Sequence, residues 1–120
     1  MSVICRWLGL AVLGSLCICR IAVAQQSLPA IGFLSANSQS SMQPRVLAFE
    51  RGLRELGYVN GKNIRIEYKF SNLNRDQLES MARELVEMKV KLILAEGPTS
   101  TRAALAVTRS IPVVVAQEIG

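Results

Sequence analysis

AIGFLS, residues 30–35, is an apolar run that follows Pro29 and leads into the small polar residues 36–41. A run of this length between such boundaries predicts a strand buried on both faces of a sheet. Helical and strand-like patterns alternate after it, which is typical of a parallel sheet covered by helices. Ligands of such sheets bind outside the carboxyl ends of the strands. The polar segment after Ser35 is therefore the first place to expect a binding site.

The rest of the chain continues this alternation. Apolar residues at three- and four-residue steps indicate helices, and short apolar or alternating runs indicate strands. The pattern predicts helices at 42–56, 74–88 and about 102–109, and further strands at 63–70, 92–95 and 113–116. Charged residues alternate with apolar ones in the 63–70 strand, which suits a position near the sheet edge, whereas the other strands are expected to be buried. With right-handed crossovers, the order predicts an α/β fold with a parallel sheet.

Local signals refine the first predicted helix. Ser40 or Ser41 can cap its start, which places Pro44 in the first turn, where a proline is tolerated. Gly57 is placed to end this helix in a left-handed conformation, and Asn60-Gly61 predicts a turn.

Residues 1–24 have the features of a cleaved signal peptide. A short, positively charged start precedes the apolar run 7–18, and Ala22-Val23-Ala24 has the small-x-small pattern of a cleavage site. A membrane anchor is the alternative, but the run is shorter than the ~20 residues that a bilayer requires. Lipidation is disfavoured because neither Cys17 nor Cys19 directly follows a small residue. We expect an exported protein whose single domain is residues 25–120.

Composition excludes several function classes. All three cysteines lie in the predicted signal peptide, and the chain has no histidine. The domain therefore lacks a thiolate nucleophile, a Ser-His-Asp triad and the commonest metal ligands, so we expect no catalysis, no metal and no cofactor. Residues 25–120 carry 12 Lys and Arg against 9 Asp and Glu, a net charge of +3, and these charges are interleaved along the sequence. Without a basic stripe we expect no nucleic-acid partner.

The segment 96–101, after the third predicted strand, is the second candidate binding element. Gly97 allows a ligand to approach the backbone, and the Thr and Ser residues that follow are placed to begin a helix. The unpaired amides and positive dipole of a helix start attract a carboxylate or phosphate, although Thr and Ser are also ordinary caps. The segments 35–41 and 96–101 would lie at the same edge of the sheet and form a crevice between them. Glu96 is the one carboxylate there, and we expect it to bind the ammonium group of an amino acid.

Three stretches carry a family likeness: QQSLPAIGFLS (25–35) after a signal peptide, FERGLRELGYVNGKNI (49–64) running into IEY (66–68), and IPVVVA (111–116). Together they resemble the substrate-binding proteins of ABC transporters, in the group that includes tryptophan- and tyrosine-uptake binding proteins. The likeness covers essentially the whole predicted domain, and the 49–68 stretch is its most specific part.

The resemblance implies a type I periplasmic clamshell of two Rossmann-like lobes, with strand order 2-1-3-4-5 in the first lobe and the ligand in the cleft between the lobes. It implies a small-molecule solute, an ABC permease in the inner membrane and a periplasmic location. The implied first-lobe contacts are a wall formed by Ser35, Ala36 and Asn37, carboxylate-binding amides from Gly97, Pro98, Thr99 and Ser100, and a cleft floor at 115–117 that includes Gln117.

Members of this family are considerably longer and contain a second lobe. We therefore expect residues 25–120 to be a partial N-terminal lobe, with strand order 2-1-3-4, that is truncated, marginally stable and weak in ligand binding. The alternative is a small flavodoxin-like domain that binds a phosphorylated ligand at its helix starts.

Overall fold

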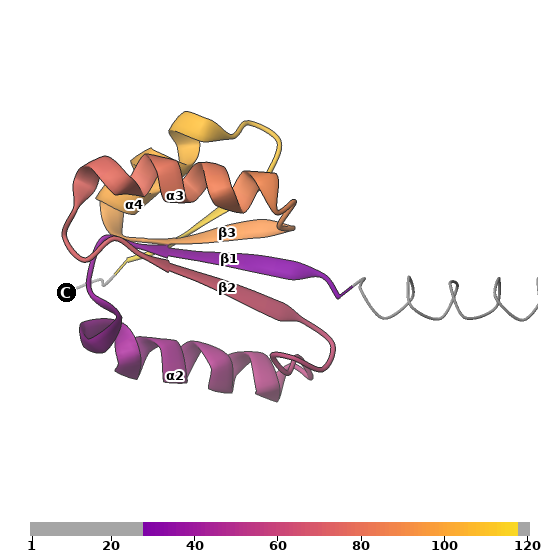
Figure 1. The fold of residues 1–120 in the computed structure, drawn as a ribbon. Coiled ribbons are helices and arrows are strands. Elements are labelled where there is room, and N and C mark those ends of the chain that lie inside the picture. The colour runs from indigo at the N-terminus through magenta and orange to yellow at the C-terminus, as the bar shows by residue number, and fades with distance from the viewer. Residues whose placement is uncertain (1–27, 118–120) are drawn as a thin grey trace, which may run out of the picture.

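The computed structural model describes residues 28–117, which form a parallel four-stranded sheet with helices on both faces (Figure 1). The predicted signal peptide and residues 118–120 lie outside the described residues. The elements in chain order are β1 (Ala30–Ser35), α2 (Gln39–Glu55), β2 (Arg65–Phe70), α3 (Arg75–Glu87), β3 (Leu92–Glu96), α4 (Gly97–Val107) and β4 (Val113–Ala116). The strand order is β2-β1-β3-β4, which confirms the predicted α/β fold and the edge position of β2. Among the described helices, none combines the length and the apolar composition needed to cross a membrane.

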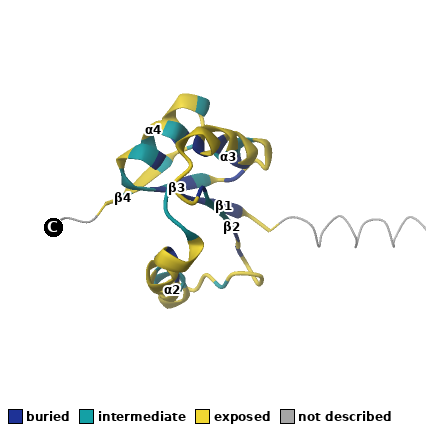
Figure 2. Cartoon of the chain, turned by 60° about the vertical axis from the view of Figure 1, so that its left-hand side comes forward, coloured by how far each residue is buried: buried dark blue, intermediate teal, exposed yellow. Residues whose placement is uncertain are grey.

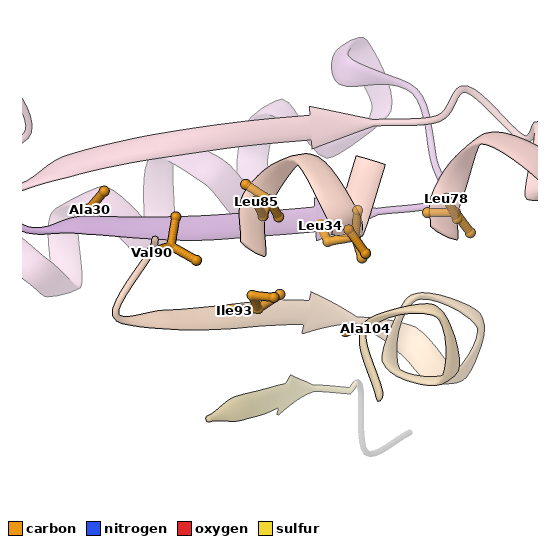
Figure 3. Packing of buried hydrophobic residues seen from close by; sticks show 8 residues of the cluster. Ala30, Leu34, Leu78, Leu85, Val90, Ile93 and Ala104 are labelled. Atoms are coloured by element: carbon orange, nitrogen blue, oxygen red, sulfur yellow. The ribbon is translucent and has the colours of Figure 1, made fainter. Parts of the chain in front are cut away.

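β1 is the centre of the structure because all six of its residues are buried. On one face, Leu34 packs with Ile93 of β3 against Leu78 and Leu85 of α3, and Figure 3 shows these side chains gathered together. Gly32 is required here, since a Cβ at this position would lie 2.9 Å from Leu85 Cδ1. The glycine inside the strand therefore allows α3 to approach the sheet closely.

The opposite face of the sheet is covered by α2. Phe33 packs there against Met42, Val46 and Ile66, and its ring centroid lies 5.5–6.0 Å from those of Phe49, Tyr68 and Phe70. This arrangement confirms the predicted alternation along β2. None of the residues in this cluster comes from β4.

β4 is not the buried strand that the sequence predicted. Val114 and Val115 are 45% and 50% exposed, although the strand pairs with β3 as expected. Within residues 28–117, β4 is the last strand on its side, and α2 packs over β1 and β2 instead. Figure 2 shows the contrast between the buried β1, the partly buried β3 and the exposed outer helix surfaces.

Two helices begin earlier than predicted. α2 starts at Gln39 because the Ser38 hydroxyl, not that of Ser40 or Ser41, caps it by accepting a hydrogen bond from Ser41 N (3.2 Å). Pro44 consequently lies in the second turn and not in the first as predicted, so it removes one helical hydrogen bond and its ring crowds the carbonyl of Ser40. Gly57 does follow the end of α2 with a left-handed φ of 91°, as predicted.

α4 begins at Gly97, five residues before the predicted start. Gly97 has a φ of 79°, a left-handed conformation that turns the chain directly from strand to helix. Residues 96–101 are therefore the end of β3 and the first turn of α4 and do not form a loop. The smaller differences are that β2 starts two residues late and α4 ends two residues early.

Candidate functional site

The candidate site is built at the carboxyl ends of β1 and β3, which we call the polar rim (residues 35–38, 71–74 and 96–98). Ser35 and Glu96 are register partners in the two adjacent strands. The fully buried Ser35 hydroxyl donates to Glu96 Oε2 at 3.0 Å, and Asn37 Nδ2 donates to the same oxygen at 3.0 Å. The structure thus brings together three of the residues that the sequence nominated.

Arg45 is the member of this cluster that sequence reasoning missed. It lies on α2, and its Nη1 is 2.8 Å from Glu96 Oε1. A helix starting at residue 42 placed Arg45 away from the apolar stripe and gave no indication of a partner 51 positions away. The packing of α2 on the sheet brings Arg45 to the carboxyl end of β3, where it reaches Glu96. The signal that could have found it is the lone carboxylate at a strand end, which requires a basic or hydrogen-bonding partner when it is partly buried.

Glu96 therefore joins three elements, β1, β3 and α2. Its side chain is only 15% exposed, and both carboxylate oxygens accept hydrogen bonds. Asn37 N also donates to Ser35 Oγ at 3.1 Å, so that hydroxyl is used as donor and acceptor. A ligand ammonium group at Glu96 would have to share this carboxylate with Arg45 or displace it.

The backbone of the 35–37 segment is held by the loop that follows β2. Ser71 N donates to Ser35 O at 3.0 Å, and Ala36 O accepts from Ser71 Oγ at 3.2 Å and from Leu73 N at 2.7 Å. Ala36 itself packs against the core beneath the rim. These bonds fix the backbone of residues 35–37, so its polar groups would need little reorganisation to bind a partner.

The start of α4 presents backbone donors to the same rim. Its N-cap residue, Glu96, makes no side-chain capping bond, and the hydroxyl of Thr101 donates back to Gly97 O (2.8 Å). The alternative that Thr and Ser merely cap this helix is therefore not what the structure shows. Pro98 has no amide hydrogen, so the prediction that it donates to a carboxylate is wrong. Gly97 and Thr99 have amides in the unpaired first turn, whereas Ser100 is the fourth helical residue, whose amide belongs to the regular bonding of α4.

The Ser100 hydroxyl, in the first turns of α4, is buried and, in the described part of the chain, unpaired. Its side chain is fully buried, and within residues 28–117 its hydroxyl oxygen has no hydrogen-bond partner. Buried hydroxyl groups are seldom left unpaired, because the desolvation cost is not recovered. An unpaired hydroxyl in the first turns of α4 is consistent with a site whose polar groups are not all satisfied within the chain.

A hollow of about 440 Å³ adjoins these groups. It is lined by Arg45, Ala48, Glu96, Val115, Ala116 and Gln117. The predicted cleft floor at 115–117 and Glu96 are thus brought to one surface, whereas Ser35 and Asn37 lie behind Glu96 and support it. The volume is within the range of about 300–1,000 Å³ that small-molecule sites occupy.

A larger hollow of about 790 Å³ lies between the start of α2 and the outer strand β2. It contains none of the nominated site residues, and Ser38 already caps the helix start beside it. Tyr68 lines it, and burial together with the hydrogen bond that its hydroxyl donates to Glu50 (2.5 Å) raises the pKa of Tyr68 above its ordinary value. The smaller hollow is the candidate site because Glu96, the lone carboxylate of the rim, lines it, although Gly97, Thr99 and Ser100 are not among its lining residues.

Comparison with known proteins identifies the family to which this chain is similar. The family model described as "ABC transporter substrate binding protein" matches residues 30–119. A tyrosine-binding protein from Clostridioides difficile (strain R20291) is 28% identical over 85 residues, which are 71% of this chain and 25% of that protein.

Two solved structures have the same fold. One is the ligand-free, open structure of a substrate-binding protein with adhesive properties from Clostridium difficile, with a TM-score of 0.68 and 24% identity over 75% of this chain and 31% of that one. The other is an ABC domain in complex with L-Trp from Streptococcus pneumonia. It has a TM-score of 0.67 and 23% identity, and the match covers 75% of this chain and 30% of that one. The chain thus spans between a quarter and a third of the length of these proteins.

Proposed function

Because this chain belongs to the family of ABC transporter substrate-binding proteins, we propose that it forms one wall of a site for an amino acid or a similar small carboxylate. The tyrosine-binding relative and the structure that contains L-Trp favour an aromatic amino acid. On this proposal the chain acts without catalysis, outside the cytoplasm, and a cleaved signal peptide directs it to the periplasm. Its partners are the solute and an ABC permease in the inner membrane.

The observation that carries the proposal is the uncapped start of α4 beside the Glu96 cluster. The amides of Gly97 and Thr99 and the positive end of the helix dipole suit a ligand carboxylate. Glu96, fixed from behind by Ser35 and Asn37, suits an ammonium group. The Arg45 side chain is 43% exposed, so it can move aside at modest cost when the ligand shares Glu96 Oε1.

The proposal concerns one wall of a cleft, because the chain matches only part of the length of its relatives. We infer that residues 28–117 correspond to part of a first lobe, which contributes one of the two walls of the cleft. Binding by this chain alone is therefore expected in the millimolar range, which ligand-detected NMR can measure.

The experiment compares L-tryptophan with two analogues, each lacking one charge. L-tryptophanamide lacks the carboxylate, and indole-3-propionate lacks the ammonium group. We expect both to bind more weakly than L-tryptophan, by about tenfold, since each loses one charge-assisted hydrogen-bonding group. In Glu96→Gln the affinity for L-tryptophan should fall by a similar factor, with that for indole-3-propionate unchanged.

The matched control is Glu79→Gln, which removes a carboxylate from an exposed ion pair with Arg83 on α3. It should leave all three affinities unchanged. Equal binding of L-tryptophan and its two analogues would refute the proposal. Competition by inorganic phosphate, with no binding of amino acids, would instead support the flavodoxin-like alternative.

A further inference from the structure

The two ends of the sheet differ sharply in charge. The connections at the end where β1 begins are residues 56–64, 88–91 and 108–112, and Figure 1 shows them at one end of the molecule. They contain Lys62, Lys89, Lys91 and Arg109 and no acidic residue. The connections at the polar rim, residues 36–38 and 71–74, contain no charged residue at all. We call the first end the basic pole and define it by its three connections together with Leu28.

The four basic side chains of this pole are exposed, and within residues 28–117 none of them forms an ion pair. Nearby, Arg54, Glu55 and Glu87 occupy the last turns of α2 and α3. Five basic against two acidic residues leave a net charge of +3, which the negative ends of the helix dipoles only partly offset. The charges are interleaved along the sequence, but the fold gathers them in space.

Apolar side chains lie among these charges. Leu56, Tyr58 and Met88 are 75%, 48% and 39% exposed, and Leu28 precedes β1 at the same end. Basic residues mixed with exposed aliphatic and aromatic side chains are the composition of surfaces that insert shallowly into the headgroup region of a bilayer. A purely electrostatic contact with a soluble acidic partner would not need the apolar residues.

We propose that the basic pole docks onto an anionic phospholipid surface. The lysine side chains can extend to lipid phosphates while Leu56, Tyr58 and Met88 enter the interface. Leu28, the first described residue, lies at this same pole, so the predicted signal peptide (residues 1–24) precedes the domain at this end. In this orientation the polar rim, at the opposite end of the strands, remains open to solute.

The test is co-sedimentation of the protein, as recovered from cells, with vesicles of phosphatidylcholine with and without phosphatidylglycerol. The variant is Lys62→Gln/Lys89→Gln/Lys91→Gln. Since each basic residue near an anionic surface contributes about fivefold to partitioning, we expect a loss on the order of a hundredfold on phosphatidylglycerol vesicles. The control, Arg75→Gln/Arg102→Gln, removes two exposed charges away from the pole and should retain most of the binding.

A second variant, Leu56→Ser/Tyr58→Ser, tests the apolar contribution and should weaken binding at high salt, where electrostatic attraction is screened. Equal losses in the lysine variant and its control would overturn the proposal. So would equal binding to both kinds of vesicle, or binding to soluble heparin with none to vesicles, which would assign the pole to a soluble acidic partner.

Discussion

The polar rim and the basic pole lie at opposite ends of the same four strands, and they use polar residues in opposite ways. At the rim, one carboxylate accepts from a serine, an asparagine and an arginine that belong to different elements. At the pole, the charged side chains extend into solvent, and turns such as the one held by Asn63, whose side chain bonds Val59 N and Gly57 O at 2.7 Å, give the loops their shape. The rim charges therefore support the fold, whereas the pole charges remain available to a partner.

The largest effect on stability is expected from removing the rim carboxylate. Glu96→Ala leaves the buried Ser35 hydroxyl and the Asn37 amide without their acceptor and removes the ion pair of Arg45. We expect the free energy of unfolding to fall by about 2–3 kcal/mol, measured by urea denaturation. A loss below about 0.5 kcal/mol, the size of a surface substitution, would show that the cluster does not hold the rim together.

A smaller loss is expected where the pole depends on backbone conformation. Gly57→Ala should cost about 1–2 kcal/mol, because Gly57 has a φ of 91° and an added Cβ meets no atom within 4 Å, so the cost is conformational. Gly52→Ala is the control, since it lies inside α2 with the same open surroundings and should stabilise by about 0.5–1 kcal/mol. Equal effects of the two substitutions would contradict the assigned left-handed turn.

The smallest effect on stability is expected at the pole lysines. Because Lys62, Lys89 and Lys91 are exposed and lack ion pairs within the described residues, replacing all three by Gln should change the free energy of unfolding by less than about 1 kcal/mol. Thermal denaturation at low and high salt measures this. A loss as large as that of Glu96→Ala would remove the contrast between the two ends.

The sequence predicted the fold because its signals are local. The apolar run of β1, the alternation along β2 and the left-handed Gly57 depend on neighbouring residues alone, and the structure confirms each. The start of α4 was misplaced because Gly97-Pro98 is typical of a loop, although the same pair can turn a strand directly into a helix. The exposure of β4 was missed because an apolar run does not show whether a helix covers it.

The site was predictable only in part. Ser35, Asn37 and Glu96 follow predicted strands, so the parallel topology alone brings them to one rim. Arg45 lies on α2, and its contact with Glu96 depends on how that helix packs across the sheet, which no local sequence signal specifies. The clustering of Lys62, Lys89, Lys91 and Arg109 is likewise a product of topology, since these residues are separated by whole elements of the chain. The signal peptide and the ligand-binding role of each rim residue stay predictions.

The most direct test of the central claim, that the rim is a solute site and the pole is not, is to titrate the ¹⁵N-labelled chain with L-tyrosine and L-tryptophan and follow its backbone amides by NMR. The claim predicts that the amides of Asn37, Gly97, Thr99 and Ser100 shift progressively at millimolar ligand, while those of Lys62, Lys89 and Lys91 stay in place. Shifts confined to the larger hollow beside β2, or no shift at any amide of the rim, would contradict it.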